Sequence, residues 1–223
     1  MYGTLLVFND EEKSNNDWEI AYYNFIREYK EISFAETQEI CKNILKSNVV
    51  KDKLSGLTTY ETKINLWLQK LEINITKEEL RDFADKTVNI WQEMISLAPD
   101  AEYVLSELLK TKTLALITNF DHSPHINRVI EKHKLNTFLN PIIISDTAEI
   151  KKPDPAIFEI ALKETGLQKE EVVFVGDSSD DIKGAIAAGI KPVLIQRNSN
   201  GGTRSKESFG SVEIINSLSR LLD

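Results

Sequence analysis

The second half of the chain alternates helical patterns with short apolar runs, and this alternation limits the possible folds more than any other feature. Beyond Pro99 the apolar runs are rich in Val and Ile and too short for helices. Helices are predicted at 100–110, 123–133, 156–165, 182–189 and 212–222, strands at 113–118, 141–144, 173–175 and 192–195, and a surface loop at 197–208. Such alternation is typical of an α/β fold whose parallel sheet carries helices on both faces.

Residues from about Asp10 to Leu97 show a different pattern, because apolar side chains recur there at helical spacing and strand signals are almost lacking. A helical subdomain inserted into the α/β domain is therefore expected. Cys41 and the aromatic residues of this region are expected to fill its core rather than to contact a substrate. These aromatic residues include Tyr22, Tyr23, Tyr29 and Tyr60.

Composition and charge argue against several partners. The net charge of −8 and the pI near 5.1 disfavour nucleic acid, because phosphate backbones select clustered Lys and Arg. Cys41 is the only cysteine, so no intrachain disulfide can form. No apolar run approaches the roughly 20 residues that span a bilayer, and no signal peptide is evident. A cytoplasmic protein without a membrane partner is expected.

Three carboxylates follow the apolar run at 173–175, where Gly176 ends a strand that is predicted to be fully buried. In open α/β sheets ligands bind at the carboxyl ends of the strands, where loops and helix N-termini converge. Asp177 and Asp181 are four residues apart, so their oxygens could meet on one side of the turn and hold Mg²⁺. In the alternative interpretation, Asp180 or Asp181 only caps the following helix.

Two further segments place polar groups at the ends of predicted strands. Thr118 and Asn119 end the run at 113–118, and small polar groups of this kind can hydrogen-bond a phosphate oxygen. Lys152 follows the run at 141–144, within the sequence Lys-Lys-Pro-Asp-Pro. Its ammonium is a mobile point charge suited to an anion, and the prolines stiffen its surroundings. Taken singly, each residue also fits an ordinary strand-end or turn role.

In this order and spacing, the three segments resemble motifs II, III and IV of the haloacid dehalogenase (HAD) superfamily of phosphohydrolases. The matching residues are 116–119, 152–158 and 174–177, with Asp181, Gly184, Ala185, Ala188 and Gly189. The resemblance covers most of the chain. It implies an α/β fold with a Rossmann-like doubly wound parallel sheet, the HAD-like core, at 1–10 and 97–223. An inserted α-helical cap, a lid over the phosphate site, would comprise 11–96.

The start of the chain resembles the first motif of the family only in part. Members have a strand that ends in a nucleophilic aspartate, then an aspartate or tyrosine two residues later, and then Gly-Thr-Leu. The chain opens Met-Tyr-Gly-Thr-Leu-Leu, which places Tyr2 at the second-acid position and the nucleophile immediately before Met1. The chain as given would then be truncated within this motif, and the central sheet would have a gap. A competing alignment puts Asn9 at the nucleophile position and Glu11 at the second acid, but an amide is a feeble nucleophile.

The resemblance implies a Mg²⁺-dependent phosphatase that acts on a small phosphorylated metabolite through an aspartyl-phosphate. Asp177 would hold Mg²⁺ with support from Asp181, and the cation would neutralise phosphoryl oxygens. Thr118 and the backbone around Asn119 would bind those oxygens.

The resemblance also implies catalytic roles for two residues outside the carboxylate turn. Lys152 would bind the substrate anion and offset the charge of the transferring group. Tyr2 stands where most members carry the acid that protonates the leaving group, so a slower reaction or another acid is implied.

Two other functions are compatible with the sequence. The 2-haloacid dehalogenases of the family carry tyrosine at the position of Tyr2 and need no metal. Asp177 and Asp181 argue against that activity, because carboxylates without a cation would repel a carboxylate substrate. A chain without its nucleophile could instead be an inactive HAD-fold binding module. Residues such as Thr118 and Lys152 would not be required by a purely structural role.

Overall fold

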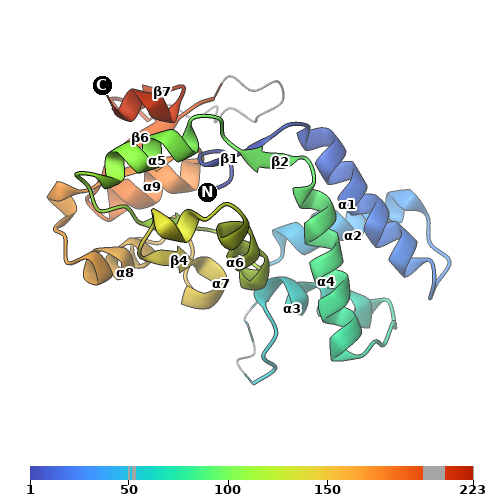
Figure 1. Cartoon of the computed structure of the whole chain (residues 1–223). Coiled ribbons are helices and arrows are strands. Elements are labelled where there is room, and N and C mark those ends of the chain that lie inside the picture. Colours follow the sequence, from blue (N-terminus) through green and yellow to red (C-terminus); the bar gives the residue numbers. More distant parts are fainter. Residues whose placement is uncertain (50, 52–53, 198–208, 223) are drawn as a thin grey trace. The chain divides into compact units, whose positions relative to one another are not determined.

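Figure 1 shows the computed structural model of the chain, which describes residues 1–49, 51, 54–197 and 209–222. Its internal contacts define two compact units. The first, called here the α/β unit, comprises Met1–Asn9, Ser96–Phe120 and Ile126–Asp223. The second, the helical unit, comprises Asp10–Ile95 and Asp121–His125. The helical unit thus includes a short segment from the second half of the chain, which helical periodicity alone did not assign to it.

The described part of the helical unit is built from helices whose N-termini explain where they begin. They are α1 (Glu11–Ile26), α2 (Phe34–Lys46), α3 (Thr59–Lys70) and α4 (Lys77–Gln92). Ser33, Thr58 and Thr76 form capping boxes at the starts of α2, α3 and α4, each with a Glu three residues on. A capping box satisfies backbone N–H groups that the first turn leaves without partners. Helix α2 buries Cys41, as predicted, and burial raises the pKa of this thiol to about 12.

A hydrogen-bonded aromatic cluster lies in the core of the helical unit. The Trp18 indole N–H and the Tyr22 hydroxyl both donate to the Tyr60 hydroxyl oxygen, over 2.9 and 2.8 Å. The Tyr60 hydroxyl also shares a 2.9 Å hydrogen bond with Thr87. Tyr22 and Tyr60 are buried, as predicted, and their polar groups are paired. The core prediction is wrong for Tyr29, which is 48% exposed because it lies beyond the end of α1.

The strands of the α/β unit form separate small sheets, and parallel pairs are found among them, as predicted for an α/β fold. They are β1 (Leu6–Phe8) with β2 (Ile95–Leu97), β3 (Leu116–Thr118) with β4 (Ile142–Ile144), and the order β5 (Val173–Gly176), β6 (Lys191–Ile195), β7 (Glu213–Ile215). Parallel pairing is recorded for β3 with β4, β5 with β6 and β6 with β7. The helices are α5 (Ala101–Leu109), α6 (Ser123–Lys132), α7 (Ser145–Ala148), α8 (Ala156–Thr165) and α9 (Ser179–Ala187), with short 3₁₀ turns η1 (Leu135–Thr137), η2 (Lys169–Glu171) and η3 (Leu218–Leu221). The first turn of α6, up to His125, belongs to the helical unit.

An apolar cluster joins the strands of the α/β unit to two of its helices. Helix α8 packs against β3 and β4, and α9 packs against β5 and β6. Phe158 of α8 meets Phe174 of β5 edge to face, with ring centroids 4.8 Å apart. The buried members of the cluster are Ile117, Ile143, Ile157, Phe158, Ala161, Ala185 and Ile190. None of the helices in the described part of the chain is long and apolar enough to cross a membrane.

The predicted parallel sheet is divided between β3 and β5. No strand of the described residues lies beside both of them, because β1 pairs with β2 instead. The prediction that the run at 173–175 is fully buried is therefore wrong: Val173 is 50% exposed, and Phe174 and Val175 are only partly buried. A strand with a ladder neighbour on one side alone leaves its other edge uncovered.

The chain end also differs from its prediction. The helix predicted at 212–222 is wrong, because Glu213–Ile215 forms strand β7 and a 3₁₀ turn follows. The apolar residues there fit helical spacing, but pairing with Val193–Ile195 of β6 fixes an extended backbone instead. The predicted surface loop at 197–208 lies outside the described residues except for Arg197.

Arg197 ties three parts of the α/β unit together through Asp100. Its guanidinium contacts the Asp100 carboxylate over 2.8 Å and donates to the Thr4 carbonyl over 3.0 Å. The same carboxylate accepts the Leu218 N–H over 2.6 Å, so it does not cap its own helix. Burial alone would raise the pKa of Asp100, but these hydrogen bonds and the Arg197 charge hold it below its ordinary value.

Asp100→Asn is expected to lower the free energy of unfolding by about 1 to 2 kcal/mol near neutral pH, because the charged hydrogen bonds to Arg197 are lost. A carboxylate with a depressed folded-state pKa contributes stability above its unfolded pKa, and this contribution is lost as pH falls through the folded value. Urea unfolding at about pH 7 and about pH 2.5 should therefore show a difference that shrinks on acidification. Glu102→Gln, at an exposed position of the same helix, is the control. An equal difference at both pH values would contradict this account.

Candidate active site

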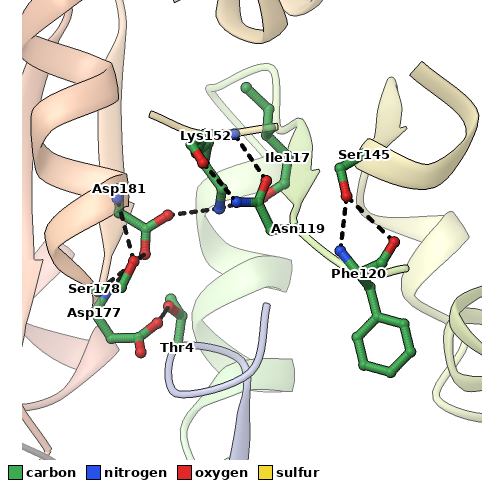
Figure 2. Close-up of polar contacts among 9 residues, drawn as sticks. All are labelled: Thr4, Ile117, Asn119, Phe120, Ser145, Lys152, Asp177, Ser178 and Asp181. Carbon is green, nitrogen blue, oxygen red and sulfur yellow. Dashed lines mark hydrogen bonds and ion pairs between the residues drawn. The ribbon is translucent and has the colours of Figure 1, made fainter. Parts of the chain in front are cut away.

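The polar residues singled out in the sequence gather where β3 and β5 end (Figure 2). Asn119 follows β3 directly, and Lys152 comes from the loop between α7 and α8. Asp177 and Asp181 follow β5, the latter within the first turn of α9. All of them belong to the α/β unit, as does Thr4 from the start of the chain.

Lys152 and Asp181 form a buried ion pair. The Lys152 ammonium lies 2.6 Å from one carboxylate oxygen of Asp181, and each side chain is only 6% exposed. The same ammonium donates to the Ile117 carbonyl over 3.2 Å. Burial alone would raise the pKa of Asp181, but the Lys152 charge and further hydrogen bonds hold it below its ordinary value. Removing either partner would leave a buried charge uncompensated.

The second carboxylate oxygen of Asp181 caps helix α9. It accepts the backbone N–H of Asp177 over 3.1 Å and that of Ser178 over 3.0 Å, and also the Ser178 hydroxyl. The helix-capping interpretation is thus confirmed for Asp181, at the third position of a capping box whose N-cap is Ser178. This cap starts α9 at Ser179, earlier than the predicted helix at 182–189. A side chain at Gly176 would lie 2.4 Å from the Asp181 Cβ, so the glycine makes room for the carboxylate.

Asp177 is held by the first residues of the chain. One of its carboxylate oxygens accepts the Thr4 hydroxyl over 2.9 Å. Gly3 has a φ of +76°, and a Cβ built on it would lie 2.1 Å from the other carboxylate oxygen. Burial raises the pKa of Asp177, and the neighbouring Asp181 carboxylate adds to the rise. The Gly-Thr pair at the start of the chain thus positions an acid from its far end.

Gly3→Ala is expected to displace the Asp177 carboxylate and to lower the free energy of unfolding by about 1 to 2 kcal/mol. The left-handed backbone conformation disfavours any side chain, and the new methyl would occupy the place of the Asp177 oxygen. Thermal unfolding measures the loss. Gly166→Ala is the matched control, since that glycine also has a positive φ but nothing within 4 Å of its Cβ position. Equal losses in the two variants would show that the contact with Asp177 has no effect.

Asn119 holds the backbone of Lys152 on both sides. Its amide oxygen accepts the Lys152 N–H over 2.9 Å, and its amide nitrogen donates to the Lys152 carbonyl over 2.9 Å. The sequence suggested that Asn119 binds substrate, but the structure commits its side chain to Lys152. The backbone N–H of Asn119 itself is the part of the segment that stays compatible with phosphate binding.

Thr118 is buried at the end of β3, with only 2% of its surface exposed. Within the described part of the chain, no hydrogen bond engages its hydroxyl. Ser145, which the sequence analysis did not single out, fixes the backbone just beyond: its hydroxyl accepts the Phe120 N–H over 2.9 Å and donates to the Phe120 carbonyl over 3.2 Å. A serine directly after the apolar run at 141–144 was the only signal for this role.

Tyr2 stacks on Phe120, with ring centroids 5.4 Å apart. Burial raises the pKa of the Tyr2 phenol well above its ordinary value, so this side chain stays protonated near neutral pH. A protonated phenol can donate a hydrogen bond but cannot take up a proton. The protonated phenol therefore fits the role of a hydrogen-bond donor and not that of the base that activates water.

The competing alignment on Asn9 gains no support from the contacts of this residue. Asn9 is exposed, and its side-chain oxygen accepts the Ser96 hydroxyl over 3.2 Å. Glu11, the second acid of that alignment, lies in the first turn of α1 in the helical unit. No hydrogen bond or ion pair within the described residues joins Asn9 to Lys152 or Asp177.

The carboxylates of Asp177 and Asp181 differ in how many oxygens they leave available for Mg²⁺. No group of three or more His, Cys, Asp or Glu residues in the described part of the chain is arranged to hold a metal ion. Both oxygens of Asp181 are engaged by Lys152 and by the cap of α9, whereas Asp177 has one oxygen that accepts no hydrogen bond from the described residues. Mg²⁺ commonly keeps several waters and takes one or two carboxylates together with substrate oxygens. Asp177 is thus the direct ligand that this donor set can offer.

The fold and this site define a class of protein, and comparison with known families agrees. A sequence model of the family described as haloacid dehalogenase-like hydrolase matches residues 16–195, so the chain belongs to this family.

Individual relatives have different activities. The phosphoglycolate phosphatase of Photorhabdus laumondii is 31% identical over 148 residues, which are 66% of this chain and 60% of that protein. The (S)-2-haloacid dehalogenase 4A of Burkholderia cepacia is 28% identical over 55% of this chain and 53% of its own length. The chain therefore spans little more than half the length of these curated relatives. The crystal structure of a HAD phosphatase from Thermococcus onnurineus matches 98% of this chain and 92% of that chain, with a TM-score of 0.65 and 23% identity, which shows a common fold.

Proposed function

We propose that this protein is a Mg²⁺-dependent phosphohydrolase that acts on a small phosphorylated metabolite. The observation that carries the proposal is the juxtaposition of Lys152, Asp177 and Asp181 at the carboxyl ends of β3 and β5. A buried ammonium next to an acid with one uncommitted oxygen suits an anion and a hard cation together. The similarity to phosphoglycolate phosphatases supports a phosphorylated substrate.

Each residue has a distinct task in the proposed reaction. The Thr118 hydroxyl and the Asn119 N–H would donate to phosphoryl oxygens, and Ser145, which accepts the Phe120 N–H, holds the following backbone in place. Lys152 lowers the energy of the charged transition state, and Asn119 fixes its backbone. Bound Mg²⁺ would supply positive charge that neutralises the phosphoryl oxygens, with Asp177 as its protein ligand.

Asp181 and Tyr2 would support this chemistry in different ways. Asp181 is a positioning residue, because it holds the Lys152 ammonium and fixes the turn that carries Asp177. Tyr2 would donate a hydrogen bond to the leaving-group oxygen and keep its proton, because its raised pKa makes the phenol a weak acid.

Two alternatives each rest on a specific observation. The similarity to a 2-haloacid dehalogenase, together with Tyr2, favours dehalogenation. The ion pair also weakens the sequence-based objection to that activity, because Lys152 neutralises one of the two carboxylates. The exposed side chain of Asn9, an amide and therefore a poor nucleophile, favours an inactive binding module.

One set of assays separates the three functions. Phosphate release from 4-nitrophenyl phosphate and from 2-phosphoglycolate is expected in Mg²⁺ and should disappear in EDTA. Chloride release from 2-chloropropionate that persists in EDTA would replace the proposal with dehalogenation. Neither product, with metal binding retained, would identify a binding module. Asp180→Asn, an exposed position in the same turn, serves as the control for purification and folding.

A further inference from the structure

The segment Asp121–His125 follows the proposed phosphate-binding residues and belongs to the helical unit. Thr118 and Asn119 precede it in the chain, with only Phe120 between. The segment is buried at its two histidines, which are each 1% exposed. Buried polar groups need hydrogen-bond partners. The residues that supply these partners therefore decide how this part of the chain is held.

Helix α3 holds both the backbone and the side chain of Asp121. The Tyr60 N–H, in the first turn of the helix, donates to the Asp121 carbonyl over 2.7 Å. First-turn N–H groups have no acceptor within their own helix, so this bond satisfies one of them. The Lys63 ammonium lies 2.7 Å from the Asp121 carboxylate, and the Lys63 side chain is only 6% exposed. Asp121 thus has a backbone partner and a charged partner on one helix.

His122 is hydrogen-bonded through both of its ring nitrogens. The Thr58 oxygen accepts the Glu61 N–H over 3.2 Å, which leaves the Thr58 hydrogen for Nδ1 of His122, 2.9 Å away. An imidazole that accepts at Nδ1 carries its proton at Nε2 when it is neutral. This Nε2 lies 2.8 Å from an Asp85 carboxylate oxygen and donates to it. The N-cap of α3 and a carboxylate of α4 thus both hold His122.

The residue just before the segment is held within the α/β unit. The Ser145 hydroxyl accepts the Phe120 N–H and donates to the Phe120 carbonyl (Figure 2). The peptide bond between Phe120 and Asp121 therefore has a hydrogen-bonded residue at each end. Because each residue has only two soft backbone dihedrals, fixing these two residues limits how the neighbouring Asn119 N–H can turn.

We propose that Lys63 and His122 are positioning residues that fix the chain beyond β3 and thereby orient the Thr118 hydroxyl and the Asn119 N–H toward a phosphoryl group. Donors that are held in place before the ligand arrives lose little freedom when it binds, which strengthens binding. This role rests on the proposed function, because it takes these two donors as the phosphate-binding groups. It adds that the helical unit contributes to phosphate affinity through the chain segment that it holds.

Lys63→Met is expected to weaken the binding of inorganic phosphate by about tenfold, which corresponds to about one hydrogen bond to a charged group. Isothermal titration calorimetry of the full chain in excess Mg²⁺ measures this affinity without any need for turnover. The KM for 4-nitrophenyl phosphate should rise by a similar factor. Backbone hydrogen exchange at residues 119–122 should become faster. A merely structural role would lower the amount of folded protein and leave Kd and KM unchanged.

Gln38→Met is the matched control. It also replaces a donor to a carboxylate by methionine, because Gln38 donates to Glu19 over 2.6 Å, but it lies on α2. Phosphate affinity and hydrogen exchange at residues 119–122 should stay as in the unmodified protein. Lys63→Arg keeps a cation for Asp121 and should recover phosphate affinity to within about threefold.

His122 is tested by a second pair of variants. His122→Leu removes both ring nitrogens and should weaken phosphate binding by about tenfold. His122→Gln has an amide that can donate to Asp85, so it should recover most of the affinity.

The outcomes separate this role from the proposed function. Equal phosphate affinity of Lys63→Met and Gln38→Met would overturn the proposal, although phosphate release by the unmodified protein would still support the phosphatase. Lys63→Arg or His122→Gln variants as weak as Lys63→Met and His122→Leu would also overturn it. Neither phosphate release nor phosphate binding by the unmodified protein would overturn both.

Discussion

Lys152→Met is expected to lower the free energy of unfolding by about 3 to 5 kcal/mol, because the Asp181 carboxylate would stay buried without its cation. Methionine is flexible and apolar like the lysine stem, so the change chiefly removes the charge. The proposed phosphatase activity should be lost as well, since the ammonium that would face the substrate anion is removed. Urea unfolding followed by circular dichroism measures the stability change.

A double variant separates the charge effect from a simple packing defect. Lys152→Met combined with Asp181→Asn should recover most of the lost stability, because no unpaired charge remains buried. The amide oxygen can still accept the N–H groups of Asp177 and Ser178 that cap α9. Activity should stay absent in both variants. A double variant no more stable than Lys152→Met alone would contradict the ion-pair account.

Asp177→Asn is expected to abolish Mg²⁺-dependent phosphate release, by about a thousandfold or more, while leaving the protein as stable as before or more stable. Burial raises the pKa of this acid. A group with a raised folded-state pKa contributes stability below its unfolded pKa, and this contribution is lost as pH rises through the folded value. Near neutral pH the ionised carboxylate therefore costs stability, and the amide avoids that cost.

Thermal unfolding in EDTA and in excess Mg²⁺ tests both halves of this prediction. The unmodified protein should gain stability from Mg²⁺ by mass action, and Asp177→Asn should not. In EDTA the midpoint of Asp177→Asn should equal or exceed that of the unmodified protein. A large loss of stability in EDTA would show that Asp177 is mainly a structural residue bound to Thr4.

The sequence predicted the elements of the α/β unit well because their signals are local. Helix α8 has the predicted bounds, and α5, α6 and β6 differ from theirs by one residue or two at an end. The predicted strand at 113–118 is longer than β3, because ladder pairing with β4 covers only its last residues. The prediction of a helix at 212–222 was wrong because a contact distant in the sequence decides the structure there. Pairing with β6 overrides an apolar spacing that fits a helix.

The candidate site was predicted as a set of residues but not as a geometry. Carboxylates, a lysine and a threonine at strand ends could be read from the sequence. The pairing of Lys152 with Asp181 and the contact of Gly3 with Asp177 depend on segments far apart in the chain, so no local pattern shows them. The commitment of Asn119 to the Lys152 backbone likewise appears only in three dimensions.

Mn²⁺ binding measured by electron paramagnetic resonance tests the central claim, a cation site on Asp177, most directly. The signal of free Mn²⁺ should fall as one ion binds the unmodified protein, and added Mg²⁺ should restore it. Asp177→Asn should leave the signal unchanged, whereas Asp180→Asn, exposed in the same turn, should behave like the unmodified protein. Equal binding by the unmodified protein and Asp177→Asn, or no binding by either, would contradict the account.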